Sequence, residues 1–456
     1  MAELSEECGI FAALSLTGQD DVVPFVYNGL FSLQHRGQEA AGIALLDQAK
    51  IDVYKGLGYV HEALRELEER APESPMALGH VRSNQSGERS VVSAQPFVGH
   101  TAHGDIAIAN NGNLINSRAL RDDLCSRGTL LQTRIDSEIL LALMARNSRL
   151  ETAQAISQAA SQAVGAFSLV LMDNKSLYAL RDPQGMKPLC VGKLGDIMMV
   201  SSESCAFENC GAELLFEVEP GEMVTISREG IKRQKVLAEA DPALCVFEYI
   251  YLARPDSILA GKNVHQTRRA LGRELGREKP IKADLVMAAP ESGISAALGL
   301  ATELGIPYEI GLVKNRYVGR TFIRPDQKTR QNALRLKLTP ISSVLKGKRV
   351  VLVDDSIVRG NTSRKTVQLL REGGAKEVYV YIASPPFRYP CYYGVDATSK
   401  DELISSRLDK EELCKAIGAD GLEFLSIEGL YRAIGVNAQE ICSACFSGKY
   451  PTVIEL

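Results

Sequence analysis

The sequence has no run of 18 apolar residues and no basic, apolar signal segment in its first 30 residues. A membrane-spanning helix and a secretory leader need such segments, so we expect a soluble, cytoplasmic protein. Neither sign of charge is in excess, because 52 Lys and Arg stand against 56 Asp and Glu, a net charge of −4. This balance gives no indication of a nucleic-acid-binding face or an acidic tail. Low-complexity tracts and fixed-period repeats are also absent.

Ten cysteines occur in the 456 residues. In a reducing cytoplasm they argue against a disulfide framework and leave room for catalysis or metal binding. The length is sufficient for two domains, each with its own core.

The apolar segments change character near residue 236. Before it they are short and are separated by turn residues, a pattern typical of antiparallel hairpins. The turns are Asp173-Asn174, Gly195-Asp196 and Glu229-Gly230. Helical patterns occur among these segments at about 24–35, 117–127, 136–147 and 151–163. The combination predicts a layered α/β sandwich.

Strands and helices alternate in the second half. ADLVMAAP precedes a predicted helix at about 292–304, and KRVVLVDD precedes another near 362–372. PYEIGLV and EVYVYIASPP are predicted to be further strands. Such near-continuous apolar strands form a mostly parallel sheet covered on both faces. Residues 391–456 show short helical patterns.

The stretch VVLVDDSIVRGNTS (350–363) is the most informative in the sequence. A buried strand would end in two aspartates at the sheet edge where α/β proteins bind ligands. The loop that follows can offer N–H groups, hydroxyls and a cation to a phosphate at a helix N-terminus. The carboxylates suit ribose hydroxyls or Mg²⁺. The alternative is a capped helix with solvated aspartates, but two acids, a hydroxyl and glycine loop and a strand–helix setting together disfavour it. The stretch is not a P-loop, because it lacks G-x-x-x-x-G-K-[ST].

Cys8 has two interpretations. It could be a small buried hydrophobe at the start of an apolar strand. If Met1 to Glu7 were removed, however, it would carry a free α-amine with an unperturbed pKa of about 7.7–8.0. That amine would be a base beside its own thiol, as in N-terminal nucleophiles.

Several motifs resemble, in order, the parts of the glutamine phosphoribosylpyrophosphate amidotransferase family. Those similar to its class II glutamine amidotransferase domain are Cys8-Gly-Ile-Phe, LQHRGQEAAGI (33–43), GHVR (79–82), NNGNLIN (110–116) and DSEIL (136–140). Residues 350–363 resemble the phosphoribosylpyrophosphate (PRPP) loop of type I phosphoribosyltransferases. EYIYLARPDS (248–257) and GLVKNRYVGRTFI (311–323) extend the resemblance, which covers essentially the whole chain.

This resemblance implies the reaction and the domains. Glutamine, PRPP and water would give 5-phosphoribosylamine, glutamate and pyrophosphate, the first committed step of de novo purine synthesis. Ammonia would pass between two active sites. The expected parts are a propeptide (1–7), an N-terminal-nucleophile glutaminase domain (8–236), a phosphoribosyltransferase domain (237–390) and a C-terminal helical segment (391–456).

By the same resemblance, Cys8 attacks the γ-carboxamide of glutamine after the propeptide is removed. Asn111 and Gly112 form the oxyanion hole, Arg82 binds the α-carboxylate and Asp136 binds the α-amine. The family usually has an aromatic residue and then a threonine shortly after the matching arginine, where this chain reads Ser83-Asn84-Gln85. It usually has histidine at the position of Asn110.

The implied PRPP site contains two groups of residues. The loop supplies Asp354, Asp355, Ser356, Arg359, Gly360, Asn361 and Thr362. A closing loop supplies Lys314, Arg316, Tyr317 and Arg320. One Mg²⁺ per subunit would lie near Ser292, Asp354 and Asp355.

Cys442-x-x-Cys445 alone is ambiguous between zinc, redox chemistry and chance, and Cys245 and Cys391 alone would be core residues. Four thiolates suit a [4Fe–4S] cluster or tetrahedral zinc, which spacing cannot separate. The resemblance favours one structural [4Fe–4S] cluster per subunit, as in the propeptide-processed, iron–sulfur branch. The remaining cysteines are interpreted as packing residues: Cys125, Cys190, Cys205, Cys210 and Cys414.

The implied partners are purine nucleotides as feedback inhibitors and further copies of the chain in a homotetramer, with no nucleic acid or membrane. Two other functions stay open. One is an amidotransferase that acts on a different acceptor, such as a sugar phosphate. The other is a PRPP- or nucleotide-sensing regulator with an inactive glutaminase.

Overall fold

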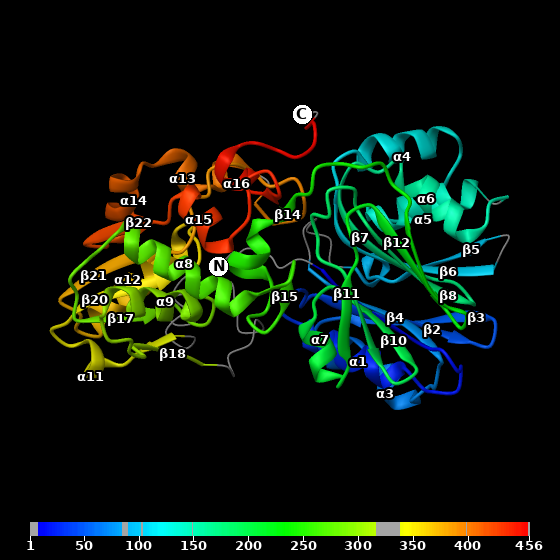
Figure 1. Ribbon diagram of the computed structural model, residues 1–456, viewed down its shortest axis with the longest axis horizontal. Helices are drawn as coiled ribbons and strands as arrows, with labels where there is room; N and C mark the ends of the chain where they lie inside the picture. The colour runs from blue at the N-terminus through cyan, green and yellow to red at the C-terminus, as the bar shows by residue number, and fades with distance from the viewer. Residues whose placement is uncertain are drawn as a thin grey trace.

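The computed structural model describes residues 8–83, 90–101, 104–147, 149–315, 338–397 and 399–454. The chain forms two lobes that lie side by side, one from its N-terminal half and one from its C-terminal half (Figure 1). No described helix is long and apolar enough to cross a membrane.

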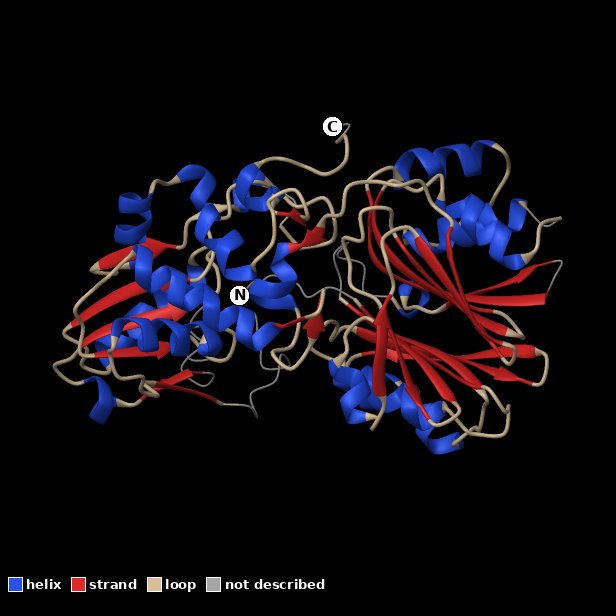
Figure 2. Cartoon of the chain, in the orientation of Figure 1, coloured by secondary structure: helices blue, strands red, loops and turns tan. Residues whose placement is uncertain are grey.

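The first domain contains two stacked antiparallel sheets with helices on their outer sides (Figure 2). In spatial order, one sheet contains β11 (Glu213–Glu217), β9 (Cys190–Leu194), β10 (Ile197–Ser201), β1 (Gly9–Ser15), β4 (Met76–Arg82), β2 (Ala40–Asp47) and β3 (Lys50–Leu57). The other contains β13 (Gly230–Lys235), β12 (Glu222–Ser227), β8 (Ser176–Arg181), β7 (Gly165–Met172), β6 (Gly104–Leu114) and β5 (Phe97–Thr101).

Helices cover both sheets. The first sheet packs against α1 (Val23–Ser32), α2 (Val60–Ala63), α3 (Arg65–Arg70) and α7 (Cys205–Asn209). The second packs against α4 (Ser117–Ser126), α5 (Asp136–Arg146) and α6 (Thr152–Ala160). These helices confirm the four predicted from the sequence. The hairpins β7–β8, β9–β10 and β12–β13 confirm the three predicted turns.

Strand β1 lies at the centre of the first sheet and is buried along its whole length. Because side chains alternate along a strand, its residues serve two cores. Ile10, Ala12 and Leu14 pack between the sheets, whereas Phe11 and Ala13 pack against the helices. This explains why an almost uninterrupted apolar run follows Cys8.

The second domain has a fully parallel sheet in the order β17 (Leu285–Ala288), β20 (Arg349–Asp354), β21 (Glu377–Ile382) and β22 (Gly421–Phe424). One face packs against α8 (Val264–Glu278), α9 (Ile294–Leu304) and α15 (Ile427–Ile434). The other packs against α12 (Asn361–Glu372) and α14 (Lys410–Ile417). The prediction of a parallel sheet covered on both faces is therefore confirmed.

Two expectations for this domain need correction. PYEIGLV is not a full strand of the main sheet: it makes one parallel bridge, between Tyr308 and Val286. Its end becomes β18 (Leu312–Lys314), which pairs with β19 (Leu338–Pro340) in a separate two-stranded sheet. The segment 391–456 is not purely helical, because it supplies β22. That strand has only four residues and lies at the edge of the sheet, so its apolar stretch in the sequence is short.

Short elements complete the chain. They are β14 (Leu244–Cys245), β15 (Ile258–Leu259), β16 (Lys262–Asn263), α11 (Ser342–Leu345), α13 (Ile404–Arg407), β23 (Ile441–Cys442), α16 (Ala444–Ser447), the 3₁₀ turns Val91–Ser93 and Lys400–Glu402, and a π-helical turn at Glu248–Leu252. The boundaries predicted at residues 236 and 390 stay predictions.

Candidate active sites

Cys8 lies directly before β1 and is half-buried. In the antiparallel pair β1–β4, Gly9 lies opposite Val81, so Cys8 lies at the same end of the sheet as Arg82. Arg82 is 5% exposed. A Cβ on Gly37 would come within 2.6 Å of the Arg82 backbone, so the glycine of the HRGQ motif permits this close approach.

The predicted oxyanion residues lie on β6, in the other sheet. Asn111 is fully buried, and neither atom of its side-chain amide has a hydrogen-bond partner among the described residues. Buried amides are normally paired, so an unpaired donor here is available to a ligand. Gly112 has φ +141°, and a Cβ would lie 2.1 Å from the carbonyl oxygen of Ala166. Only glycine fits this position.

Asp136 is the first residue of α5, and its carboxylate accepts a hydrogen bond from the Leu114 N–H at 2.8 Å. This contact ties it to the end of the oxyanion strand. Burial raises the pKa of Asp136 to about 6, against the lowering effects of that hydrogen bond and the Arg121 charge. A cationic ligand would favour the ionised form.

Sequence reasoning missed a buried polar network behind this site. His80 Nε2 lies 3.2 Å from the carbonyl oxygen of Asn110, which bridges β4 and β6. Burial lowers the pKa of His80 to about 3, so its ring is neutral at physiological pH. The amide of Gln95 contacts the Asn110 backbone and accepts a hydrogen bond from Ser137 Oγ at 2.5 Å. A lone glutamine before a proline carries no charge or spacing signal, so Gln95 could not be singled out from sequence.

The second site lies at the carboxyl edge of β20. Asp355 is 8% exposed and accepts hydrogen bonds from the hydroxyls of Ser356, at 2.6 Å, and Ser292. Asp354 Oδ1 accepts the backbone N–H of Asp355. Burial raises the pKa of Asp355, and both hydroxyls oppose that rise. Two carboxylates and a hydroxyl are the oxygen donors that Mg²⁺ takes, so these residues fit that ion.

The loop after the aspartates leads into α12. Gly360, at φ +74°, precedes the helix, and Asn361 and Thr362 form its first turn. Their N–H groups lie at the helix end that attracts anions. The Arg359 guanidinium, expected to face PRPP, pairs with Glu402 at 2.5 Å and lies 3.9 Å from Asp396.

Of the predicted closing loop, only Lys314 is described. Its Nζ lies 4.0 Å from the carboxylate of Glu291, beside Ser292. Arg316, Tyr317 and Arg320 lie outside the described residues, as do Met1 to Glu7 and Asn84 and Gln85.

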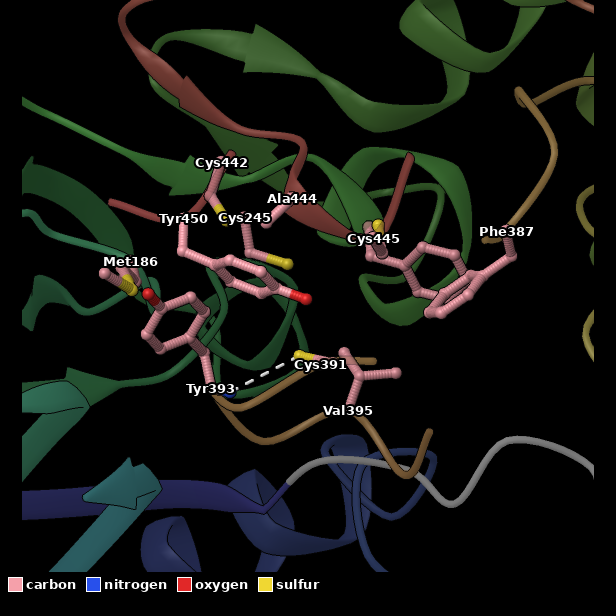
Figure 3. Close-up of a pocket in the computed structure, with 11 residues that line it drawn as sticks. Met186, Cys245, Phe387, Cys391, Tyr393, Val395, Cys442, Ala444, Cys445 and Tyr450 are labelled. Atoms are coloured by element: carbon pink, nitrogen blue, oxygen red, sulfur yellow. Dashed lines mark hydrogen bonds between the residues drawn. The ribbon is translucent and has the colours of Figure 1, made fainter. Parts of the chain in front are cut away.

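The four predicted cluster ligands, Cys245, Cys391, Cys442 and Cys445, line a single cavity of about 20 Å³ (Figure 3). Parallel pairing of β14 with β23 sets Cys245 opposite Cys442. Cys445 lies in α16, and its carbonyl accepts the N–H groups of Arg388 and Tyr389, just before Cys391. Aromatic side chains surround the thiols. No disulfide joins any of the ten cysteines, all of which lie among the described residues.

All four cysteines line this one cavity. Within the described ranges, no group of three or more His, Cys, Asp or Glu could hold a single metal ion. Burial raises the pKa of Cys442 to about 12 and raises that of Cys445 well above its usual value, with added effects from the neighbouring thiols. Four thiols gathered in one apolar cavity are the donor set that either a [4Fe–4S] cluster or a tetrahedral zinc ion takes.

Two models of known domains match the chain. A glutamine amidotransferase domain model matches residues 82–209, and a phosphoribosyl transferase domain model matches residues 255–397. The chain is also 44% identical to the amidophosphoribosyltransferase of Bacillus subtilis, with 99% of this chain and 95% of the relative covered. The chain belongs to the amidophosphoribosyltransferase family.

Other amidophosphoribosyltransferases are similar to this chain over nearly its whole length. That of Methanocaldococcus jannaschii is 45% identical, with 98% of both chains covered. A solved structure of the B. subtilis glutamine PRPP amidotransferase, complexed with ADP and GMP, superposes with a TM-score of 0.93 at 44% identity and 98% coverage of both chains. Like its family, this chain joins a glutamine amidotransferase domain to a phosphoribosyltransferase domain and catalyses the first step of purine synthesis. The family disfavours both open alternatives, the amidotransferase for another acceptor and the regulator without glutaminase.

Proposed function

We propose that this enzyme forms 5-phosphoribosylamine in two half-reactions that use separate residues. The observation that carries the proposal is the pairing of two sites in one chain. An unpartnered, buried Asn111 amide lies on β6 in the first domain, and a buried Asp355 precedes a helix N-terminus in the second.

In the first half-reaction the Cys8 thiolate attacks the γ-carboxamide carbon of glutamine. The resulting oxyanion accepts hydrogen bonds from the Asn111 side chain and the Gly112 N–H. The Cys8 α-amine has taken the proton of the thiol and returns it to the leaving nitrogen as the C–N bond breaks, so that ammonia departs. Water then hydrolyses the thioester to glutamate and the free thiol. Arg82 and Asp136 select the amino acid by its charged α-carboxylate and α-ammonium groups.

In the second half-reaction ammonia displaces pyrophosphate at C1 of PRPP. Asp354 and Asp355 hold the ribose hydroxyls or the ion, and residues 356–362 hold the 5-phosphate at the start of α12. Ser292, Asp354 and Asp355 would hold Mg²⁺, which when bound offsets the charge of the leaving pyrophosphate. Lys314, Arg316, Tyr317 and Arg320 exclude water from the oxocarbenium-like centre. To bind PRPP, the Arg359 side chain must first break its ion pair with Glu402.

Cys245, Cys391, Cys442 and Cys445 would hold a [4Fe–4S] cluster. Its role would be structural, because its ligands join the start of the second domain to the end of the chain. The cavity also touches Met186 of the first domain, so the cluster would stabilise the junction.

Three further features belong to this proposal. Residues 1–7 would be a propeptide whose removal exposes the Cys8 amine. Purine nucleotides would inhibit, which is supported by the relative's complex with ADP and GMP. The assembly would be a homotetramer, and the enzyme would act in the cytoplasm.

One experiment tests the chemistry and the processing together. Anaerobically purified enzyme would be assayed for glutamine hydrolysis and phosphoribosylamine formation, and its intact mass would be measured. We expect both activities in protein that begins at Cys8. Full activity with Met1 to Glu7 attached contradicts the processing, and an absence of glutaminase activity contradicts the function.

A further inference from the structure

Arg36 is a charged side chain buried at the junction of the two domains. It is 1% exposed, and its Nε donates a hydrogen bond to the carbonyl oxygen of Cys8 at 3.1 Å. A guanidinium stays charged at any pH that the protein experiences, so its burial requires anionic partners.

Those partners come from both domains. Glu203, in the first domain, accepts a hydrogen bond from Arg36 Nη1 at 2.6 Å. Glu248, in the second domain, accepts from Nη1 at 3.0 Å and from Nη2 at 2.7 Å. Both carboxylates are fully buried. The two-pronged contact with Glu248 therefore fixes the plane of the guanidinium as well as its position.

Residues of the second domain also form hydrogen bonds with Glu203, although Glu203 itself belongs to the first domain. Its Oε2 accepts the N–H of Arg254 at 2.8 Å and the hydroxyl of Ser257 at 2.6 Å. Burial alone would raise the pKa of Glu248, but the Arg36 charge holds it below its usual value. Glu248 is thus ionised, and both carboxylates described here as partners of Arg36 belong to, or are held by, the second domain.

A second buried arginine holds the turn that carries Glu248. Arg268, on α8, donates from Nε to the carbonyl of Tyr249 at 2.7 Å and from Nη2 to that of Ala253 at 2.8 Å. It is 4% exposed. These bonds fix both ends of the π-helical turn, so the Glu248 carboxylate has a defined position relative to the core of the second domain.

We propose that Arg36 is a positioning residue for the nucleophile and that Glu248 of the second domain sets its position. The glutaminase site is then complete only with a carboxylate from the phosphoribosyltransferase domain. The physical reason is that Arg36 touches no reacting atom but holds the backbone of Cys8, and a shift of about 1 Å at a nucleophile can cost about a hundredfold in rate. This inference rests on the proposed role of Cys8.

The test compares Glu248→Gln and Arg36→Lys in the full-length, processed enzyme. Each removes the two-pronged ion pair while keeping a side chain of similar size. We expect kcat for glutamine hydrolysis to fall about tenfold or more, since the nucleophile loses its alignment. The KM for glutamine should change by less than about threefold, because Arg82 and Asp136 are untouched. Ammonia-dependent synthesis should stay within about twofold, because the PRPP loop is unchanged.

Glu222→Gln is the matched control. Glu222 is a buried glutamate of the first domain that contacts Arg233 through both oxygens, at 2.7 and 3.0 Å, on the hairpin β12–β13. Its substitution removes the same kind of ion pair without touching Arg36. We expect wild-type kcat from this variant. The double variant Arg36→Lys, Glu248→Gln should lose no more than the worse single variant, because both act through one contact.

Wild-type glutaminase kcat in Glu248→Gln would overturn the inference, as would equal losses in both half-reactions. If Glu248→Gln does not fold, Glu248→Asp decides the question. Glu248→Asp keeps the negative charge but moves it away from Arg36 by the length of one methylene. A wild-type glutaminase kcat in this variant would also overturn the inference. Glutaminase activity that persists in Cys8→Ala would instead contradict the proposed function itself.

Discussion

The side-chain amide of Gln95 pairs with both backbone groups of Asn110, accepting its N–H at 2.8 Å and donating to its carbonyl at 3.3 Å. At Asn110, the residue before Asn111, the Gln95 side chain thus makes the two backbone hydrogen bonds that a neighbouring strand would otherwise make. Since Ser137 donates to the same amide oxygen, Gln95 also ties this strand to the helix that begins at Asp136. Asn111 and Asp136, the residues proposed to bind the two ends of glutamine, are therefore anchored next to the same side chain.

Gln95→Met should weaken glutamine hydrolysis selectively. It keeps the side-chain volume but leaves the buried Asn110 N–H without its acceptor, at a cost of about 1–3 kcal/mol, whereas the Asn110 carbonyl keeps its contact with His80. We expect a lower kcat for glutaminase and a lower Tm, with ammonia-dependent synthesis retained. Kinetics on both half-reactions would check this, with Gln158→Met, an exposed site on α6, as control. An unchanged glutaminase kcat would argue against any role for Gln95.

Cys8→Ala should abolish glutamine-dependent synthesis and keep synthesis from free ammonia. The covalent route needs the thiol, whereas the PRPP site shares no group with it. Phosphoribosylamine formation would be measured with glutamine and with ammonium salts at a pH where some ammonia is unprotonated. Cys125→Ala, at an exposed cysteine, is the control. Equal loss with both nitrogen sources in a folded variant would contradict the two-site mechanism.

Asp136 should make glutamine binding pH-dependent. Burial raises its pKa from 3.8 to about 6, so below about pH 6 the carboxyl is neutral and cannot attract the substrate ammonium. The KM for glutamine should therefore rise as the pH falls through this range. Over this range the ratio of ionised to neutral carboxyl changes about tenfold per pH unit. A KM for glutamine that stays constant between pH 5 and 7 would therefore show that Asp136 does not bind the amine.

Asp136→Asn should separate function from stability. A raised pKa means that Asp136 contributes stability fully below pH 3.8 and loses that contribution as the pH rises through about 6. At pH 7.5 the neutral asparagine, which can still accept the Leu114 N–H, should give a Tm at or above wild type while the KM for glutamine rises. Asp122→Asn, at an exposed acid on α4, should change neither. A large drop in Tm would show that the ionised carboxylate is structural.

Asp355→Asn should retain glutaminase chemistry and lose phosphoribosylamine formation. The change removes a negative charge from the PRPP edge while the contacts with Ser292 and Ser356 can persist. Assays of both half-reactions and of PRPP affinity would check this, with the exposed Asp401→Asn as control. Wild-type affinity and synthesis in the variant would rule out the role.

Cys391→Ser should lose iron and destabilise the chain. We expect brown protein with about four irons per chain from the wild type, by cluster stoichiometry. Removing one ligand should lower both iron content and Tm, because the C-terminal segment loses its attachment. Cys414→Ser, at a half-buried cysteine away from the cavity, should keep both. Colourless wild-type protein that carries zinc would contradict the cluster.

The sequence by itself determined what is local or carried by a contiguous motif. The three hairpins, the helices around 117–163, the parallel strands before Asp354 and the loop into α12 follow from periodicity and turn residues over short spans. Cys8, the Asn111-Gly112 pair and Asp355 could be named because each belongs to a recognisable string of neighbours.

Only the tertiary structure decided how distant segments meet. Strand β22 was hidden because four residues at a sheet edge give little signal. The roles of Gln95 and His80 were not predicted, because both depend on contacts with the backbone of Asn110, which lies on β6 and is distant in sequence. Arg36 and Glu248 are 212 positions apart, so nothing along the chain couples them. Their contact exists because a buried guanidinium needs carboxylates, and the packing of the two domains supplies one from each side.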